Sequence, residues 1–234
     1  MAREANGAGE LSGDLELAIR AVAARERPDG ALDLSINSTR GEIEGILHPC
    51  EGQPGAAIFV GGALGGLDGP AGGLYARLGE QLAHPEAGPG LSSLRLHYRR
   101  PGDFEECVLD VLGGVSVLKA IGARRVALVG HSFGGAVAIK AGELSELACG
   151  VAALSSQIHG TRTVERLSPK PLLLAHGAAD GVIDCATSRD IYERAQEPKR
   201  LVLYEGAGHS LMQCAEELFA LLQAWLSEVA ARPE

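Results

Sequence analysis

The sequence predicts an α/β protein whose central sheet is mostly parallel, with an antiparallel hairpin at its N-terminal edge and helices on both faces. From residue 56 onward, short apolar runs typical of buried strands alternate with segments of helical periodicity. Before them, residues 31–36 and 42–47 have strand character and are joined by a polar turn at 37–41. No Pro-, Gly- or Ser-rich linker follows, so residues 31–234 are predicted to form one domain.

The first thirty residues carry a different pattern. Residues 12–27 are predicted to form an amphipathic helix, which the Pro-Asp-Gly sequence at 28–30 ends. The apolar residues at helical spacing in this segment are Leu15, Ala18, Ile19 and Val22. We therefore expect residues 1–30 to be an N-terminal helical extension that packs on the main domain.

The alternating elements place any functional site at one edge of the sheet. The predicted strands after the hairpin are residues 56–60, 91–98, 125–129, 151–154, 171–175 and 200–204. The predicted helices are residues 74–83, 105–121, 135–147, 185–195 and 211–230. Open parallel sheets bind ligands outside the carboxyl ends of their strands, so residues that directly follow a strand are the candidates for chemistry.

Composition excludes several classes of function. The 234 residues carry a formal net charge of -9 and no run of Lys and Arg, which argues against binding to nucleic acids or anionic membranes. No segment approaches the ~20 apolar residues of a membrane helix, and the N-terminus lacks a secretory pattern. The five cysteines are scattered singly, which is typical of reduced thiols. We expect a cytoplasmic protein, either a monomer or a homodimer.

The most informative segment is Gly130-His131-Ser132-Phe133-Gly134, a G-x-S-x-G pattern between an apolar strand and a helix. Glycines on both sides of a serine allow a sharp strand-to-helix turn that exposes the hydroxyl. Ser132 is therefore the predicted nucleophile, and an ordinary turn serine is the alternative. His131 is interpreted as a structural residue beneath the turn rather than as the base.

A serine hydroxyl needs a base, and the base needs an acid that orients it. His209 follows the last predicted strand in a Gly-rich loop and is the predicted base. Asp180 follows the preceding strand and is the predicted acid, whereas Asp184 suits the start of a helix. His176 is expected to pack or to bond to the backbone.

The oxyanion formed in such chemistry is stabilised by backbone N–H groups. Phe133 supplies one, and Ala63 in the Gly-rich segment 61–66 is predicted to supply the other. The remaining candidate contacts to substrate are Gly62, Leu64, Asp68 and His159. Asp68 is otherwise a turn residue. No cofactor and no metal are expected.

With these segments the sequence resembles the α/β-hydrolase superfamily over about residues 31–230, and within it the dienelactone-hydrolase-like esterases. The resemblance rests on residues 130–135, 176–180, 206–210 and 61–66. It implies the α/β-hydrolase fold and a catalytic triad of Ser132, Asp180 and His209. Two features depart from that group: the nucleophile is serine instead of the usual cysteine, and Gly61 stands where many relatives have histidine.

The interval from Ser155 to Lys170 is too short for a cap domain, so we expect an open site. The leading hypothesis is a serine hydrolase that cleaves carboxylic esters of small or exposed acyl substrates through an acyl-enzyme. A peptidase, amidase or thioesterase with the same triad is one alternative, and a non-catalytic small-molecule-binding protein is another. Arg99 and Arg100 are either surface residues or contacts for a substrate carboxylate.

Overall fold

The computed structural model describes residues 15–84 and 90–231. The strands within these residues are β1 Ile19–Glu26, β2 Leu32–Ser38, β3 Gly41–His48, β4 Gly55–Val60, β5 Ser92–His97, β6 Arg125–His131, β7 Ala148–Leu154, β8 Leu172–Gly177 and β9 Lys199–Tyr204. The α-helices are α1 Pro70–Ala83, α2 Phe104–Ala120, α3 Phe133–Leu144, α4 Ala186–Arg194 and α5 Ala215–Ala231. Two short 3₁₀ helices span Val164–Leu167 and Met212–Cys214.

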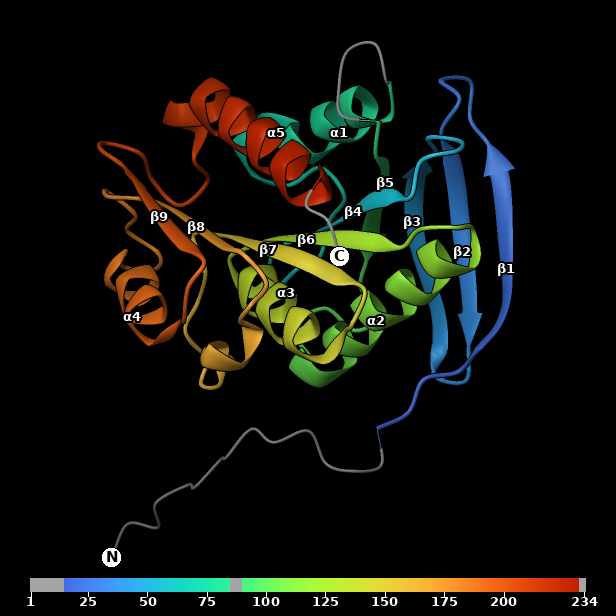
Figure 1. The fold of residues 1–234 in the computed structure, drawn as a ribbon, viewed down its shortest axis with the longest axis horizontal. Helices are drawn as coiled ribbons and strands as arrows, with labels where there is room; N and C mark the ends of the chain where they lie inside the picture. The colour runs from blue at the N-terminus through green and yellow to red at the C-terminus, as the bar shows by residue number, and fades with distance from the viewer. Residues whose placement is uncertain (1–14, 85–89, 232–234) are drawn as a thin grey trace, which may run out of the picture.

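All the strands belong to one nine-stranded sheet in the order β1-β2-β3-β5-β4-β6-β7-β8-β9 (Figure 1). From β5 to β9 every neighbouring pair is parallel, and β1, β2 and β3 pair antiparallel at one edge. The predicted mixed sheet with an antiparallel N-terminal hairpin is therefore confirmed.

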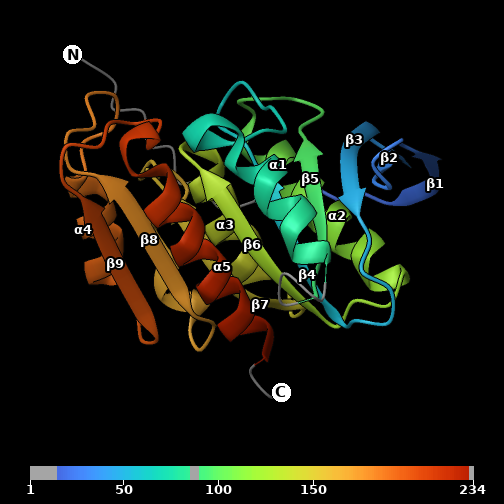
Figure 2. The same cartoon turned by 90° about the horizontal axis from the view of Figure 1, so that it is seen from above.

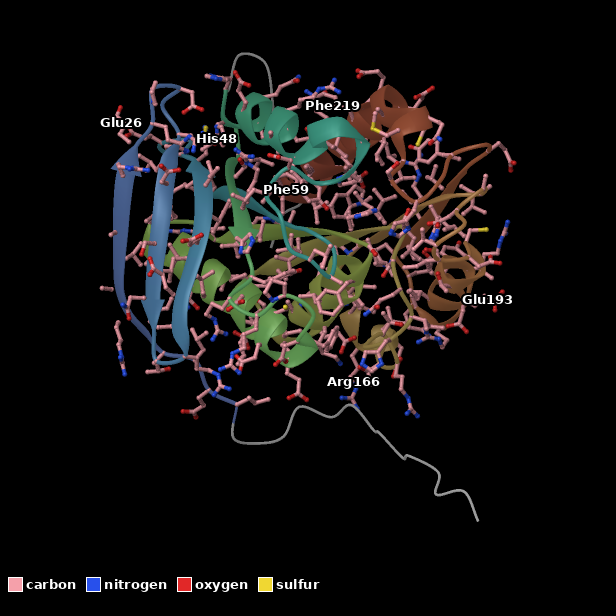
Figure 3. All side chains as sticks on the ribbon, turned by 180° about the vertical axis from the view of Figure 1, so that it is seen from behind. Glu26, His48, Phe59, Arg166, Glu193 and Phe219 are labelled. Atoms are coloured by element: carbon pink, nitrogen blue, oxygen red, sulfur yellow. The ribbon has the colours of Figure 1, made fainter. Side chains whose placement is uncertain are left out.

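The helices form two layers around the sheet. Figure 1 shows α1 and α5 on one side and α2, α3 and α4 on the other, and Figure 2 shows α1 and α5 lying over the parallel strands. Each layer encloses its own apolar core, because alternate residues of a strand point to opposite faces. In β4, Phe59 (labelled in Figure 3) packs under α1 with its ring 5.0 Å from that of Tyr75. Ile58 belongs to the core on the opposite face. Every residue of β4 is buried, as its uninterrupted apolar sequence predicted.

The predicted helix at residues 12–27 is wrong where the structure describes it. Ile19–Glu26 is strand β1, paired antiparallel with β2 from Ile19↔Ser38 to Glu26↔Leu32. Residues 12–14 of that prediction lie outside the described residues. The segment is rich in alanine and arginine, which favour helices, but pairing with β2 satisfies the backbone groups on one side of the strand. Tertiary pairing therefore outweighs the local preference.

The carboxyl ends of the parallel strands lie at one edge of the sheet, and the loops that follow them define the candidate site. The interval between β7 and β8 contains only the 3₁₀ helix Val164–Leu167, so no cap covers this edge. Between residues 15 and 231, leaving out 85–89, no helix is both long and apolar enough to cross a membrane.

Candidate active site

Ser132 occupies a sharp turn between β6 and α3. Its φ of 58° and ψ of -118° lie in a region that side chains rarely adopt, and the residue directly precedes the helix. The turn requires glycine on both sides. A Cβ at Gly130 would overlap the backbone of Gly134, and a Cβ at Gly135 would lie 2.7 Å from Oγ of Ser156. The glycines thus permit the strained conformation that exposes the Ser132 hydroxyl, as the G-x-S-x-G pattern predicts.

Ser132 and His209 meet at the carboxyl edge of the sheet. Ser132 Oγ lies 3.1 Å from Nε2 of His209, a residue in the loop after β9. On the other side of the ring, Nδ1–H of His209 donates to Oδ2 of Asp180 at 2.7 Å. Asp180 follows β8, and its side chain is fully buried. The three residues proposed from their order along the chain are therefore joined by two hydrogen bonds. Asp184 instead accepts the N–H of Ala186 at the start of α4.

The Asp180 carboxylate is surrounded by donors. Oδ1 accepts the backbone N–H groups of Val182 at 2.8 Å and Ile183 at 2.9 Å, while Oδ2 faces both His209 and Nε2 of His176 at 3.1 Å. Burial acts to raise the pKa of Asp180, but the Ile183 N–H, the His209 side chain and the Val182 N–H outweigh it and lower that pKa. Asp180 is therefore held as a carboxylate that can orient the His209 ring.

His131 supports the proposed base, His209, and is not itself the proposed base. Its ring Nε2–H donates to the backbone carbonyl of His209 at 3.0 Å, and the two rings lie 4.9 Å apart. Burial lowers the pKa of His131 to about 4, so the ring is neutral at pH 7. The structural interpretation from the sequence agrees with this arrangement.

The loop after β4 lies against the nucleophile. A Cβ at Gly62 would be 3.7 Å from Cβ of Ser132, and Gly62 also pairs with Gly65 in an isolated antiparallel bridge. Ala63 is next in the chain and is exposed. Within the described residues, neither its N–H nor that of Phe133 has a backbone acceptor. Both N–H groups are therefore candidate donors to a ligand beside Ser132.

The two other residues predicted to contact substrate, Asp68 and His159, are both exposed. Asp68 is exposed, and its carboxylate lies 3.5 Å from the guanidinium of Arg95, which is itself buried. His159 is exposed and lies edge-on to Phe104, which in turn contacts Phe133. Asp68 therefore connects the segment after the Gly-rich loop to β5, and the His159 ring contacts the nucleophile turn through Phe104.

Sequence reasoning named Leu64 as a candidate contact but missed three other exposed apolar side chains in the loops at this edge of the sheet. Of the seven large apolar side chains that are exposed in the described part of the chain, four follow the carboxyl ends of parallel strands. These four, which we call the apolar rim, are Leu64, Ile158, Val182 and Met212. Leu64 is 93% exposed and adjoins Ala63, and Val182 is 74% exposed in the Asp180 loop. A single apolar residue in a loop has no periodicity, so only the fold reveals that they share an edge.

Arg99 and Arg100 differ in environment although they are neighbours. The Arg99 side chain is 3% exposed and forms ion pairs with Glu106 and Asp110, both buried. The Arg100 side chain is 62% exposed. The expectation of a surface residue or a substrate contact is therefore wrong for Arg99, which is enclosed in a network between β5 and α2.

Among residues 15–84 and 90–231, no group of three or more His, Cys, Asp or Glu side chains could hold a metal ion.

Comparison with known proteins finds sequence similarity over part of the chain. Residues 146–216, which include Asp180 and His209, match the model of a family described as serine aminopeptidase, S33. A segment of 56 residues, 24% of this chain, is 43% identical to the uncharacterized protein YfhR of Escherichia coli. That segment spans 20% of YfhR, so the similarity covers about a fifth of the relative.

Solved structures resemble the chain over most of its length. Est1E from Butyrivibrio proteoclasticus is 16% identical with a TM-score of 0.70, covering 86% of this chain and 99% of that chain. XC6422 from Xanthomonas campestris, described as a serine hydrolase without a lid, is 16% identical with a TM-score of 0.69, covering 90% and 100%. A dienelactone hydrolase from Anabaena variabilis is 19% identical with a TM-score of 0.68, covering 88% and 96%.

The chain therefore has the α/β-hydrolase fold, with no cap domain between β7 and β8. At these identities the solved structures establish the fold and leave the reaction to be argued from the site itself.

Proposed function

We propose that the protein is a serine hydrolase that cleaves carboxylic esters through an acyl-enzyme intermediate. The observation that carries this proposal is the chain of two hydrogen bonds from Ser132 through His209 to Asp180. A buried carboxylate, an imidazole and a hydroxyl in this order activate the hydroxyl for attack on a carbonyl carbon. A protein that only bound a ligand would have no need for all three.

The proposed reaction has two stages. His209 takes the proton of Ser132 as Oγ attacks the ester carbonyl, and Asp180 stabilises the imidazolium that forms. The N–H groups of Ala63 and Phe133 hold the oxyanion of the tetrahedral intermediate. His209 then protonates the departing alcohol, and it activates a water molecule that hydrolyses the acyl-enzyme.

The open edge of the sheet favours small or exposed acyl substrates. No cap lies between β7 and β8, so a substrate reaches Ser132 from solvent without a lid to move. The apolar rim offers contacts to the part of the substrate outside the oxyanion site. Esterases occur among the proteins of similar fold, including acetyl xylan esterase 1 from Thermoanaerobacterium.

A second candidate function is peptide hydrolysis. The matched family model is described as serine aminopeptidase, and the same catalytic groups would attack an amide carbonyl. An amide has a poorer leaving group than an ester, so amide turnover requires more accurate protonation of the departing nitrogen by His209. Thioesters share the good leaving group of esters and are tested together with them.

The test is a panel of matched esters, thioesters and amides with acetyl, butyryl and octanoyl groups. We expect ester turnover with a burst of released alcohol equal to the concentration of enzyme, because the acyl-enzyme accumulates. Ser132→Ala, measured beside the wild type, should lose both the burst and the turnover. Turnover confined to amides would favour the peptidase, and folded wild type that hydrolyses none of the compounds would contradict the enzymatic proposal.

A further inference from the structure

A second histidine contacts the carboxylate that orients His209. His176 is the fifth residue of β8, and its side chain is fully buried. Its Nε2 lies 3.1 Å from Oδ2 of Asp180 and 3.0 Å from the carbonyl oxygen of Ile183. Its Nδ1 lies 2.7 Å from Oγ of Ser188, a fully buried residue in the first turn of α4. A continuous line of buried polar groups therefore runs from α4 to Asp180.

The surroundings of the His176 ring determine where its proton lies. The carboxylate of Asp180 and the carbonyl of Ile183 only accept hydrogen bonds, so Nε2 must carry the hydrogen that both of them face. In a neutral imidazole the other nitrogen is then an acceptor. Nδ1 thus accepts the hydrogen of the Ser188 hydroxyl, and this bond selects the tautomer that donates to Asp180.

His176 and His209 bond to the same oxygen of the Asp180 carboxylate. Oδ1 of Asp180 is held by the N–H groups of Val182 and Ile183. Oδ2 receives His209 and His176. In the proposed reaction the His209 ring gains and loses a proton, so its own bond to Oδ2 changes at each stage. His176 is the donor to Oδ2 that stays constant and shares its negative charge.

We propose that His176 and Ser188 are positioning residues: Ser188 sets the tautomer of His176, and His176 Nε2–H holds Asp180 Oδ2 in line with His209. This inference rests on the proposed function for its catalytic consequence. It extends the site inward from the loops to β8 and to the first turn of α4. Both residues act through Asp180 and do not touch substrate.

A purely structural role is the competing explanation. The same bonds also tie β8, the Asp180 loop and α4 together, so a variant could lose activity by unfolding alone. Two measurements separate these roles. The first is the ¹H NMR signal of the proton between Nδ1 of His209 and Asp180, which appears far downfield when that bond is short and ordered. The second is the separation of kcat from KM on a good ester substrate.

The variants are chosen to keep or remove the donor. His176→Gln places an amide N–H near the position of Nε2, whereas His176→Leu removes the donor and keeps an apolar group of similar volume. Ser188→Ala removes the hydroxyl. His48→Leu and Ser93→Ala are matched controls, because His48 and Ser93 are also buried and lie outside the site. Thermal unfolding and circular dichroism establish that each variant is folded before it is measured.

We expect His176→Leu to broaden or shift the downfield signal and to lower kcat about tenfold to a hundredfold with little change in KM, as for small displacements of a catalytic group. Ser188→Ala should lower kcat about fivefold, the effect of one lost hydrogen bond. His176→Gln should retain the signal and most of kcat, and both controls should match the wild type.

Folded His176→Leu and Ser188→Ala with an unchanged signal and unchanged kcat would overturn the proposal. Equal losses in His176→Gln and His176→Leu would do so as well, because packing rather than the donor would then matter. The NMR signal does not depend on any substrate. If the wild type hydrolysed no ester, the proposed function would fail while the hydrogen-bond arrangement was still tested.

Discussion

The backbone of Gly134 packs directly against the carbonyl oxygen of Gly61, so a Cβ at residue 134 would overlap that oxygen and lie 2.9 Å from the carbonyl oxygen of Val60. Gly134 belongs to the turn that carries Ser132, and Gly61 begins the loop that carries Ala63. This contact therefore sets the distance between the nucleophile and one of the proposed oxyanion donors.

Gly134→Ala is expected to separate these two loops and to lower kcat/KM on an ester by about a hundredfold or more, because catalysis is sensitive to displacements of about 1 Å. The measurement is steady-state hydrolysis, with circular dichroism to establish folding. Gly181→Ala is the matched control, because a Cβ at Gly181 meets no atom within 4 Å. Full activity of Gly134→Ala would show that the two loops do not need this close approach.

The apolar rim leads to a prediction about acyl-chain preference. Leu64→Ser and Val182→Ser should each lower the ratio of octanoyl to acetyl ester turnover, in kcat/KM, by about fivefold, since each loses about 1 kcal/mol of apolar contact. Acetyl ester turnover should change little. Ile121→Ser is the control, because Ile121 is an exposed apolar residue that follows α2, away from the site. A ratio that falls equally in all three variants would contradict the role of the rim.

The buried network around Arg99 leads to a prediction about stability. Arg99 pairs with Glu106 and Asp110, and its removal would leave the fully buried Asp110 carboxylate without a cationic partner, whereas Glu106 would keep Arg40. Arg99→Met should therefore lower the free energy of unfolding by about 3–5 kcal/mol in urea titrations. Arg100→Met should change it by less than about 0.5 kcal/mol, because the Arg100 side chain is mostly in water. Similar small changes in both variants would mean that the network contributes little.

His131 makes the stability depend on pH. Burial lowers its pKa to about 4 in the fold, whereas the ordinary value is 6.5. Between these values the unfolded chain binds the proton more readily, so stability is lost as the pH falls from about 6.5 to 4. The contribution is at most about 1.4 kcal/mol per pH unit. The lowered pKa of Asp180 acts in the same direction but at lower pH.

Urea unfolding of the wild type and of His131→Asn at several pH values between 4 and 7 measures this contribution. The variant should have a shallower dependence over that window, while His159→Asn, an exposed histidine, should follow the wild type. Parallel curves for wild type and His131→Asn would contradict the neutral, buried state of His131.

Two kinds of feature could be predicted from the sequence: strands with an uninterrupted apolar pattern, and catalytic residues that occur in a fixed order along the chain. The apolar runs of β4 and β6 identify buried strands, because both faces of a central parallel strand are covered. The G-x-S-x-G pattern, followed by an acid and a base each placed after a strand, identified Ser132, Asp180 and His209 as the residues that meet. Parallel strands bring their carboxyl ends to one edge, so order along the chain translates into proximity.

The parts that could not be predicted depend on contacts between distant segments. Residues 19–26 have the composition of a helix, and only the partner strand β2 makes them a strand. The sequence allows a surface position for Arg99, and only the packing of α2 brings Glu106 and Asp110 against its side chain. His176 was expected to pack or to bond to the backbone, and its bond to Asp180 depends on the path of the loop between them.

The most direct test of Ser132 as the nucleophile is covalent labelling with a fluorophosphonate, followed by intact-protein mass spectrometry and peptide mapping. We expect one label for each wild-type chain, located on Ser132, and none on Ser132→Ala. A folded wild type that remains unlabelled, or a label on another serine, would contradict the assignment of Ser132 as the nucleophile.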